Sequence, residues 1–323
     1  MMRVSAKRTF ALGKRGVLNY FLKNPLCVSF EVTHSCNAKC KHCHLGGPVE
    51  EQRASAERYA EIYQEIKPVV AQMSGGEPLL RNDLEQIIKA MKQPNGTPYI
   101  VITTNAALLT PERYRSLLEA GTDEFSISLD YPDTRHDDFR GIPGLFDRIE
   151  KLITSLPSGT GRAITLCCVI QSDNFRDCIQ MAELAREWGV KLNFSTYTFL
   201  RTNNKSYMLS AEEIEEFETI VERLIEFKKK CGVIYTSGFV LKKIIEFFRN
   251  QQMPRCRTGT RFFNVNPDGT LSPCGLIIQN HRSQRELRHN FANRNSCVYC
   301  YTSIRANSEK PARHLIKDSF ESL

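Results

Sequence analysis

The stretch Cys36-Asn37-Ala38-Lys39-Cys40-Lys41-His42-Cys43 places three cysteines at a C-x3-C-x2-C spacing, directly after an apolar run over residues 27–32. Three thiolates so close together favour a soft metal or an iron–sulfur cluster. A four-iron cubane has four corners, so three cysteines leave one iron open, and an open coordination position makes a metal site reactive. Zinc is the alternative, because a fourth ligand is available from His34, His42 or His44.

The composition indicates a globular protein that keeps its thiols reduced. The chain has 323 residues, 41% of them hydrophobic and 25% charged, and 44 basic against 36 acidic residues give a net charge of +8. This charge is spread along the chain, so no nucleic-acid partner is expected. Twelve cysteines occur without a secretory signal pattern or an apolar run of membrane-spanning length. We therefore expect a cytoplasmic protein whose cysteines bind metal or clusters and form no disulfides.

A basic segment comes before the first predicted strand. Residues 7–23 mix lysines and arginines with apolar residues, and Val17, Leu18, Phe21 and Leu22 share one face of a helix. Two interpretations are open. A helix packed on the domain is favoured by the modest length and by the glycines, which weaken the helix. A basic amphipathic helix that touches a membrane surface is the alternative.

Strand-like and helix-like segments alternate through the next part of the chain. Apolar runs rich in Val, Ile, Phe and Thr occur near residues 27–33, 69–74, 99–104, 124–130, 163–170 and 192–197. Helix signals lie between them, such as Thr110-Pro111 at a start and Gly121 at an end. Six strands with helical crossovers predict an α/β fold with parallel strands. Such folds carry their active sites at the carboxyl ends of the strands.

The predicted strand ends carry chemically suggestive residues. The second ends in Ser74-Gly75-Gly76-Glu77-Pro78, the third in Thr103-Thr104-Asn105-Ala106 and the fourth in Ser126-Ile127-Ser128-Leu129-Asp130, with Arg140-Gly141 next. Two glycines allow close backbone approach to a ligand, and a carboxylate accepts from an ammonium group. Each motif alone also fits a turn, a cap or a surface residue. Their order, each after a predicted strand, argues for a shared site.

At these motifs the sequence resembles the radical S-adenosylmethionine (SAM) superfamily, over about residues 27–305. The resemblance implies a [4Fe-4S] cluster on Cys36, Cys40 and Cys43 whose open iron chelates SAM. Cleavage of SAM then gives a 5′-deoxyadenosyl radical. By the same resemblance, SAM contacts come from His42, Gly75, Gly76, Glu77, Asn105, Ser128, Asp130 and Arg140. An asparagine is common in relatives at the position of Asn174.

A second cysteine set lies near the C-terminus: Cys256, Cys274, Cys297 and Cys300, with a hairpin turn at residues 266–270. Four thiolates satisfy every iron of a cubane, and a four-cysteine zinc site is the alternative. The region resembles the twitch form of the SPASM/twitch enzymes. This implies one auxiliary [4Fe-4S] cluster.

The expected fold is thus a partial (β/α)6 TIM-like barrel with a small C-terminal twitch-type cluster-binding region. The expected boundaries are a basic helical segment (1–26), the partial barrel (27–209), a helical connector (210–252), the cluster region (253–305) and a tail (306–323). Arg201, Tyr197 and Tyr235 are possible pocket residues.

The expected function is hydrogen abstraction from a small-molecule, sugar or lipid-like substrate. The expected partners are an electron donor such as flavodoxin or ferredoxin and, at most, a peripheral membrane surface. A peptide or protein side-chain maturase and a zinc-binding non-enzyme are the alternatives.

Overall fold

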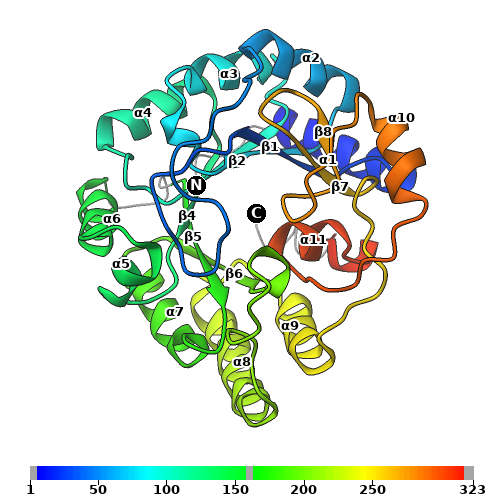
Figure 1. The fold of residues 1–323 in the computed structure, drawn as a ribbon. Coiled ribbons are helices and arrows are strands. Elements are labelled where there is room, and N and C mark those ends of the chain that lie inside the picture. Colours follow the sequence, from blue (N-terminus) through cyan, green and yellow to red (C-terminus); the bar gives the residue numbers. More distant parts are fainter. Residues whose placement is uncertain (1–5, 158–162, 316–323) are drawn as a thin grey trace. The chain divides into compact units, whose positions relative to one another are not determined.

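The computed structural model describes residues 6–157 and 163–315 and confirms the α/β class (Figure 1). The strands form one sheet of eight in the order β6-β5-β4-β3-β2-β1-β7-β8, which does not close on itself. The chain divides into two compact units that interleave along the sequence. Unit 1 comprises residues 1–39, 45–126 and 257–295, and unit 2 comprises residues 40–44, 127–256 and 296–323. The domain boundaries expected from the sequence stay a prediction, and the end of the tail, 316–323, lies outside the described residues.

Unit 1 contains the first half of the parallel sheet and its covering helices. In Figure 1, α2, α3 and α4 lie on the outer side of β1 and β2. The parallel strands pair in register, with Cys27 opposite Val70 and Val70 opposite Tyr99. The elements of this unit are α1 (Ala6–Phe21), β1 (Cys27–Thr33), α2 (Ala56–Ile66), β2 (Val70–Gly75), η1 (Pro78–Leu80), α3 (Leu84–Met91), β3 (Tyr99–Thr104), α4 (Pro111–Ala120), β7 (Phe262–Val265), β8 (Leu271–Ser272), α10 (Gln284–Leu287) and η4 (Arg288–Ala292). β4 (Glu124–Ser128) belongs to both units.

The helix ends in unit 1 follow from local side-chain chemistry. As predicted, α4 begins at Pro111, with the Thr110 hydroxyl accepting from the Arg113 N–H, and ends at Gly121 in the left-handed region, φ 117°. α3 follows Asp83, a residue type common at helix starts, but the Asp83 side chain makes no capping hydrogen bond. Its carboxylate instead pairs with Arg81 at 2.7 Å. An ion pair has replaced the cap.

A strand from the far end of the chain completes the sheet of unit 1. β7 pairs in parallel with β1, with Cys27 opposite Phe262, and β8 pairs antiparallel with β7. The predicted turn joins β7 and β8, because Asn266 donates its N–H to the Thr270 carbonyl at 2.8 Å. The sequence predicted six sheet strands and did not predict that this hairpin extends the same sheet.

Unit 2 contains the remaining strands and a helical layer outside them. β5 and β6 pair in parallel, with Cys167 opposite Asn193. A capping box opens α8, since Ser210 and Glu213 bond each other's backbone. The elements are α5 (Arg135–Arg140), α6 (Leu145–Ser155), β5 (Ile164–Ile170), η2 (Phe175–Asp177), α7 (Cys178–Glu187), β6 (Lys191–Thr196), η3 (Phe199–Arg201), α8 (Ala211–Cys231), α9 (Gly238–Asn250) and α11 (Ser303–Ser308). Among the helices of residues 6–157 and 163–315, none has both the length and the apolarity to cross a bilayer.

Candidate active site and cysteine clusters

The two glycines after β2 are required by the backbone beside them. A Cβ on Gly75 would lie 1.9 Å from the Thr33 carbonyl oxygen, and one on Gly76 would lie 2.2 Å from that of Ser35. Gly75 also has φ 134°, a conformation that other residues avoid. The Gly76 and Glu77 N–H groups donate to the carbonyls of Thr33 and Ser35 at 2.8 and 2.9 Å. The glycines therefore fasten the end of β2 to the segment that leads into Cys36. A direct contact with SAM stays a prediction.

Glu77 ties the end of β2 to the end of β3. The Glu77 residue is 1% exposed. Its carboxylate accepts from the Thr104 hydroxyl at 2.6 Å and from the Asn105 N–H at 2.8 Å. The Asn105 side chain in turn donates to the Asn37 side chain at 2.8 Å, inside the cysteine loop. Within unit 1, the predicted residues Glu77 and Asn105 thus form one hydrogen-bonded chain that positions the residue after Cys36.

The start of the loop is held by backbone pairing. Cys36 and Gly47 exchange both backbone hydrogen bonds, at 3.0 and 2.9 Å, and the Ala38 N–H lies 3.4 Å from the Cys36 sulfur. His34, one of the possible zinc ligands, pairs with Glu31 at 3.0 Å, and this hydrogen bond raises the pKa of His34. The His34 ring is therefore paired with Glu31, a residue of β1.

In unit 2, the rest of the loop is fastened to α5. Lys41 donates its N–H to the Phe139 carbonyl at 3.0 Å, and a turn bond joins Cys43 to Cys40 at 3.1 Å. The His42 ring stacks on the Phe139 ring, with centroids 4.9 Å apart and an angle of 12°. Burial, with Arg140 and Arg201 nearby, lowers the pKa of His42 well below its usual range, so the ring is neutral. A neutral His42 ring suits this stacking on the Phe139 ring.

Arg140 lies between a carboxylate and a cysteine. Its guanidinium contacts the Asp130 carboxylate at 2.8 and 2.6 Å, and Nη1 donates toward the Cys40 sulfur at 3.6 Å. Asp130 is fully buried, and its other oxygen accepts from the Val169 N–H at 3.0 Å. Burial raises the pKa of the Cys40 thiol, and Arg140 opposes that rise. Asp130 thus positions Arg140. The contacts of both residues with SAM stay predictions.

Two further side chains hold Asp130 in place. The Asp130 N–H lies 3.2 Å from Nδ1 of His136, whose pKa is lowered by burial, so this nitrogen acts as an acceptor. The Asn174 amide donates to the Asp130 and Val169 carbonyls at 2.9 and 3.0 Å. Asn174 therefore joins the ends of β4 and β5. Ser128, at the end of β4, is half-buried.

The possible pocket residues separate into three environments. Arg201 donates to the Cys43 sulfur at 3.4 Å, a second arginine–thiol contact that the sequence did not predict. Tyr197 is buried, and its hydroxyl donates to the Asn204 carbonyl at 2.6 Å. Tyr235 is half exposed. Only Arg201 of the three adjoins a predicted cluster ligand.

Three cysteines of the C-terminal set lie in unit 2. Cys256 donates its N–H to the Cys297 carbonyl at 2.9 Å, and Met253 donates to Val298 at 2.8 Å, so the two segments pair as a short ladder. Thr198 bonds the Tyr299 carbonyl at 2.9 Å and anchors the C-x2-C segment after β6. Cys274 lies in unit 1, two residues after the end of β8, where it forms an isolated bridge with Ile277.

Arg305 is the centre of the unit 2 cysteine segment. The residue is fully buried on α11, and its guanidinium donates to the Cys300 carbonyl at 2.6 Å, to the Pro254 carbonyl and toward the Cys300 sulfur at 3.8 Å. It also pairs with Glu309 at 3.1 Å. Burial raises the pKa of the Cys300 thiol, and Arg305 opposes that rise. This is the third arginine that adjoins a predicted cluster ligand.

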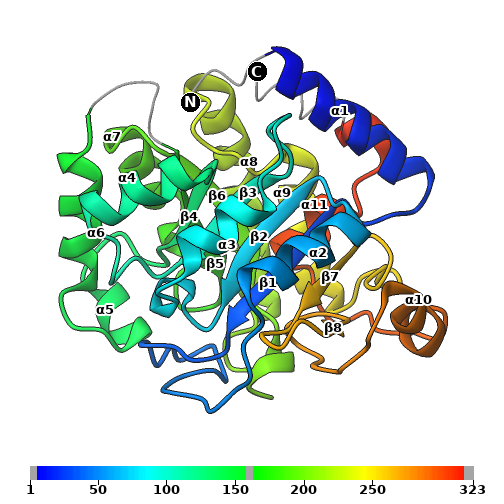
Figure 2. The ribbon, with the colours of Figure 1, turned by 90° about the horizontal axis from the view of Figure 1, so that it is seen from above.

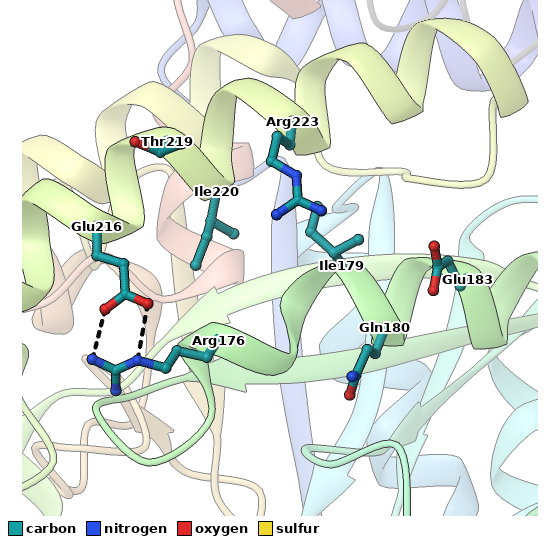
Figure 3. Close-up of a pocket in the computed structure, with 8 residues that line it drawn as sticks. All are labelled: Arg176, Ile179, Gln180, Glu183, Glu216, Thr219, Ile220 and Arg223. Atoms are coloured by element: carbon teal, nitrogen blue, oxygen red, sulfur yellow. Dashed lines mark hydrogen bonds and ion pairs between the residues drawn. The ribbon is translucent and has the colours of Figure 1, made fainter.

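Within residues 6–157 and 163–315, no three His, Cys, Asp or Glu side chains converge enough to hold one metal ion. Cubane ligands need no such convergence, because each thiolate binds a different iron. A surface groove lies elsewhere, between α7 and α8 of unit 2, and contains none of the predicted site residues. Figure 3 shows the double hydrogen bond of Arg176 with Glu216 across it, at 2.9 and 2.6 Å.

Comparison with known proteins agrees with the cysteine loop and the sheet. Residues 30–211 match the model of the radical SAM superfamily. The chain belongs to this superfamily, whose members bind a [4Fe-4S] cluster and SAM, and it is an enzyme. This assignment overturns the alternative of a zinc-binding non-enzyme.

Individual relatives differ in what their names describe. The chain is 29% identical over 297 residues to an AdoMet-dependent heme synthase of Oleidesulfovibrio alaskensis, covering 82% of this chain and 74% of the relative. It is 28% identical over 269 residues to a PqqA peptide cyclase of Granulibacter bethesdensis, covering 78% and 68%. The structure of Streptococcus suis SuiB with S-adenosylmethionine matches with a TM-score of 0.64 and 17% identity, covering 81% of this chain and 64% of SuiB. The last likeness shows the fold alone.

Proposed function

We propose that this enzyme holds its SAM-binding [4Fe-4S] cluster on Cys36, Cys40 and Cys43. The observation that carries this proposal is the pairing of thiols with arginines in unit 2, Arg140 with Cys40 at 3.6 Å and Arg201 with Cys43 at 3.4 Å. Thiolates are the metal-binding form of cysteine, and adjacent guanidinium groups favour that form. Cysteines with a merely structural role need no such neighbours.

A cluster held by these cysteines, given one electron by the proposed donor, would cleave SAM to methionine and a 5′-deoxyadenosyl radical, and this radical would abstract hydrogen from the substrate. The chain's own residues orient and shield the site. Glu77 and Asn105 position the loop through Asn37, and Asp130 holds the Arg140 guanidinium against Cys40. The further proposed SAM contacts, by resemblance, are His42, Gly75, Gly76 and Ser128.

We further propose one auxiliary [4Fe-4S] cluster on Cys256, Cys274, Cys297 and Cys300. The ladder between Cys256 and Cys297 and the bonds of Arg305 to Cys300 support it, because they fix the backbone of three of the four ligands. Four protein ligands leave no iron open, so electron transfer suits this cluster better than substrate binding. A flavodoxin or ferredoxin is the proposed electron donor for the enzyme.

The proposed substrate is a small-molecule, sugar or lipid-like compound. The relation to the heme synthases supports this, since three of these enzymes match 78–82% of the chain at 27–29% identity. A peptide maturase is the second candidate. It is favoured by the relation to the PqqA peptide cyclases.

Iron and sulfide content of the anaerobically reconstituted protein tests the two clusters. We expect about eight irons in the wild type and about four in the Cys36/Cys40/Cys43→Ala variant. The variant in which Cys256, Cys274, Cys297 and Cys300 are all replaced by Ala is expected to lose the four irons of the auxiliary cluster. Cys231→Ala, at the end of α8, is the matched control and keeps all eight. Zinc in place of iron, or unchanged iron in the triple variant, would contradict the proposal.

Formation of 5′-deoxyadenosine separates the two substrate classes. Reconstituted enzyme with SAM and reductant is given a bacterial lipid extract, an aqueous small-molecule fraction or a peptide fraction. Stimulation by either of the first two fractions is the expected result. Stimulation by the peptide fraction alone would contradict a small-molecule, sugar or lipid-like substrate and favour the peptide maturase. The Cys36/Cys40/Cys43→Ala variant gives the background.

A further inference from the structure

Helix α1 buries its polar side and exposes its apolar side. Within unit 1, Arg8 pairs with Asp123 at 2.6 Å and donates to the Gly96 carbonyl at 2.8 Å. Further along the same side, Arg15 bonds the Tyr63 hydroxyl at 2.5 Å. Asn19 is buried and donates to two loop carbonyls, at 2.8 and 3.0 Å. These bonds fix the rotation of α1, the dark-blue helix in Figure 2.

The outward side of α1 is a stripe of large apolar side chains. Phe10 is 73% exposed and Phe21 is 75% exposed, with Val17, Leu18 and Leu22 also exposed beside them. These five make up half of the ten exposed large hydrophobic residues in the described part of the chain, and the other five are scattered. Because exposed apolar patches are costly in water, such a concentration marks an interaction surface. The packed-helix interpretation holds for the polar side only.

Positive charge flanks the apolar stripe. Residues 1–30 contain six lysines and arginines and no acidic residue. Of these, Lys7, Lys14 and Lys23 are exposed. Lys14 lies between Phe10 and Val17 on the same helix face, at spacings of four and three residues. The surface therefore combines aromatic and aliphatic side chains with ammonium groups, which is the composition of helices that lie in a lipid interface.

We propose that α1 docks the enzyme on an anionic membrane surface. The apolar stripe enters the boundary between headgroups and acyl chains, and the three lysines meet lipid phosphates. Charge complementarity selects this partner over a second copy of the chain, because a symmetric pair would bring the lysines of both copies together. The proposal rests on unit 1 alone and does not depend on the cluster assignments.

Vesicle flotation with the full reconstituted chain tests the proposal. We expect the protein to float with vesicles of phosphatidylcholine and phosphatidylglycerol and to stay unbound with phosphatidylcholine alone. Replacing Lys7, Lys14 and Lys23 with Gln is expected to weaken binding on the order of 100-fold, at about fivefold per lysine. Phe10→Ser with Phe21→Ser is expected to weaken binding at least about tenfold. The Ile278→Ser variant, which removes an exposed apolar side chain outside α1, is the matched control.

Iron content and circular dichroism establish that each variant is folded. Failure of the wild type to float with anionic vesicles would overturn the proposal. Equal loss of binding in the Ile278→Ser variant would also overturn it. If light scattering instead shows a dimer that becomes monomeric in the Phe10→Ser/Phe21→Ser variant, the apolar stripe binds a second copy of the chain and the membrane proposal is wrong. Because the iron assay is independent, these outcomes leave the cluster assignments unaffected.

Discussion

Replacing Arg305 with Met tests whether this buried guanidinium holds the C-terminal cysteine segment together. Met keeps similar bulk and removes every donor. The carbonyls of Cys300 and Pro254 then lose the charged donor that they share in the wild type. Arg305 is fully buried there, so solvent does not readily replace it. Each hydrogen bond to a charged group contributes about 1.5–3 kcal/mol, so the two carbonyl bonds together give a loss of about 3–6 kcal/mol. Because total stabilities are about 5–15 kcal/mol, this change would be large.

Urea unfolding of the cluster-free protein measures this loss. Trp188 is the one tryptophan of the chain, lies in unit 2 and is 3% exposed, so its fluorescence reports on the unit that contains Arg305. Arg176→Met is the matched control. It removes an arginine of the same unit whose pair with Glu216 is exposed to solvent, and we expect an unchanged unfolding curve. If Arg305→Met costs less than about 1 kcal/mol, the segment is not held by this residue and the reasoning is wrong.

Three shorter predictions test other contacts. Gly76→Ala would place a Cβ 2.2 Å from the Ser35 oxygen, so it should displace the cysteine loop, lower the stability by about 1–3 kcal/mol or more and remove about four irons. In Gly16→Ala the new Cβ meets nothing within 4 Å, so this variant should stabilise α1 by up to about 1 kcal/mol. Unfolding curves and iron assays check both variants. Glu77→Gln should lower cluster occupancy, since its amide group would face donors from Thr104 or Asn105; retained iron would contradict this. The hydrogen bonds with Arg81 lower the pKa of Asp83, so this carboxylate should contribute stability above its usual pKa of about 4 and lose that contribution as the pH falls through the lower folded value. The unfolding free energies of Asp83→Asn and the wild type should therefore converge in acid. A difference between them that stays constant with pH would refute this role of Asp83.

The parallel strands and helix ends were predictable because their signals are local. Buried strands are continuous apolar runs, and the caps at Thr110 and Ser210 depend on residues within four positions. β7 escaped prediction as a sheet strand because it is four residues long and its partner, β1, lies at the other end of the chain. No local pattern carries that pairing.

The motifs predicted which residues form the site, but not the contacts that each of them makes inside the protein. Gly75 and Gly76 suggested space for a ligand, whereas the neighbours that exclude a side chain are the backbone of residues 33–35. The predicted contact of Asp130 with SAM stays a prediction, and the sequence did not predict that both of its oxygens accept hydrogen bonds inside the protein. For α1, periodicity revealed two faces but not which one packs inward, because the acceptors of Arg8 and Asn19 are carbonyls of distant loops.

The pairing of β1 with β7 has a consequence for how the chain is made. β1 is synthesised before β7, so one of its two edges stays open until residues 262–265 have left the ribosome. An open strand edge is a template for pairing with other chains. Nascent or prematurely terminated chains that lack β7 would therefore be prone to aggregate through this edge.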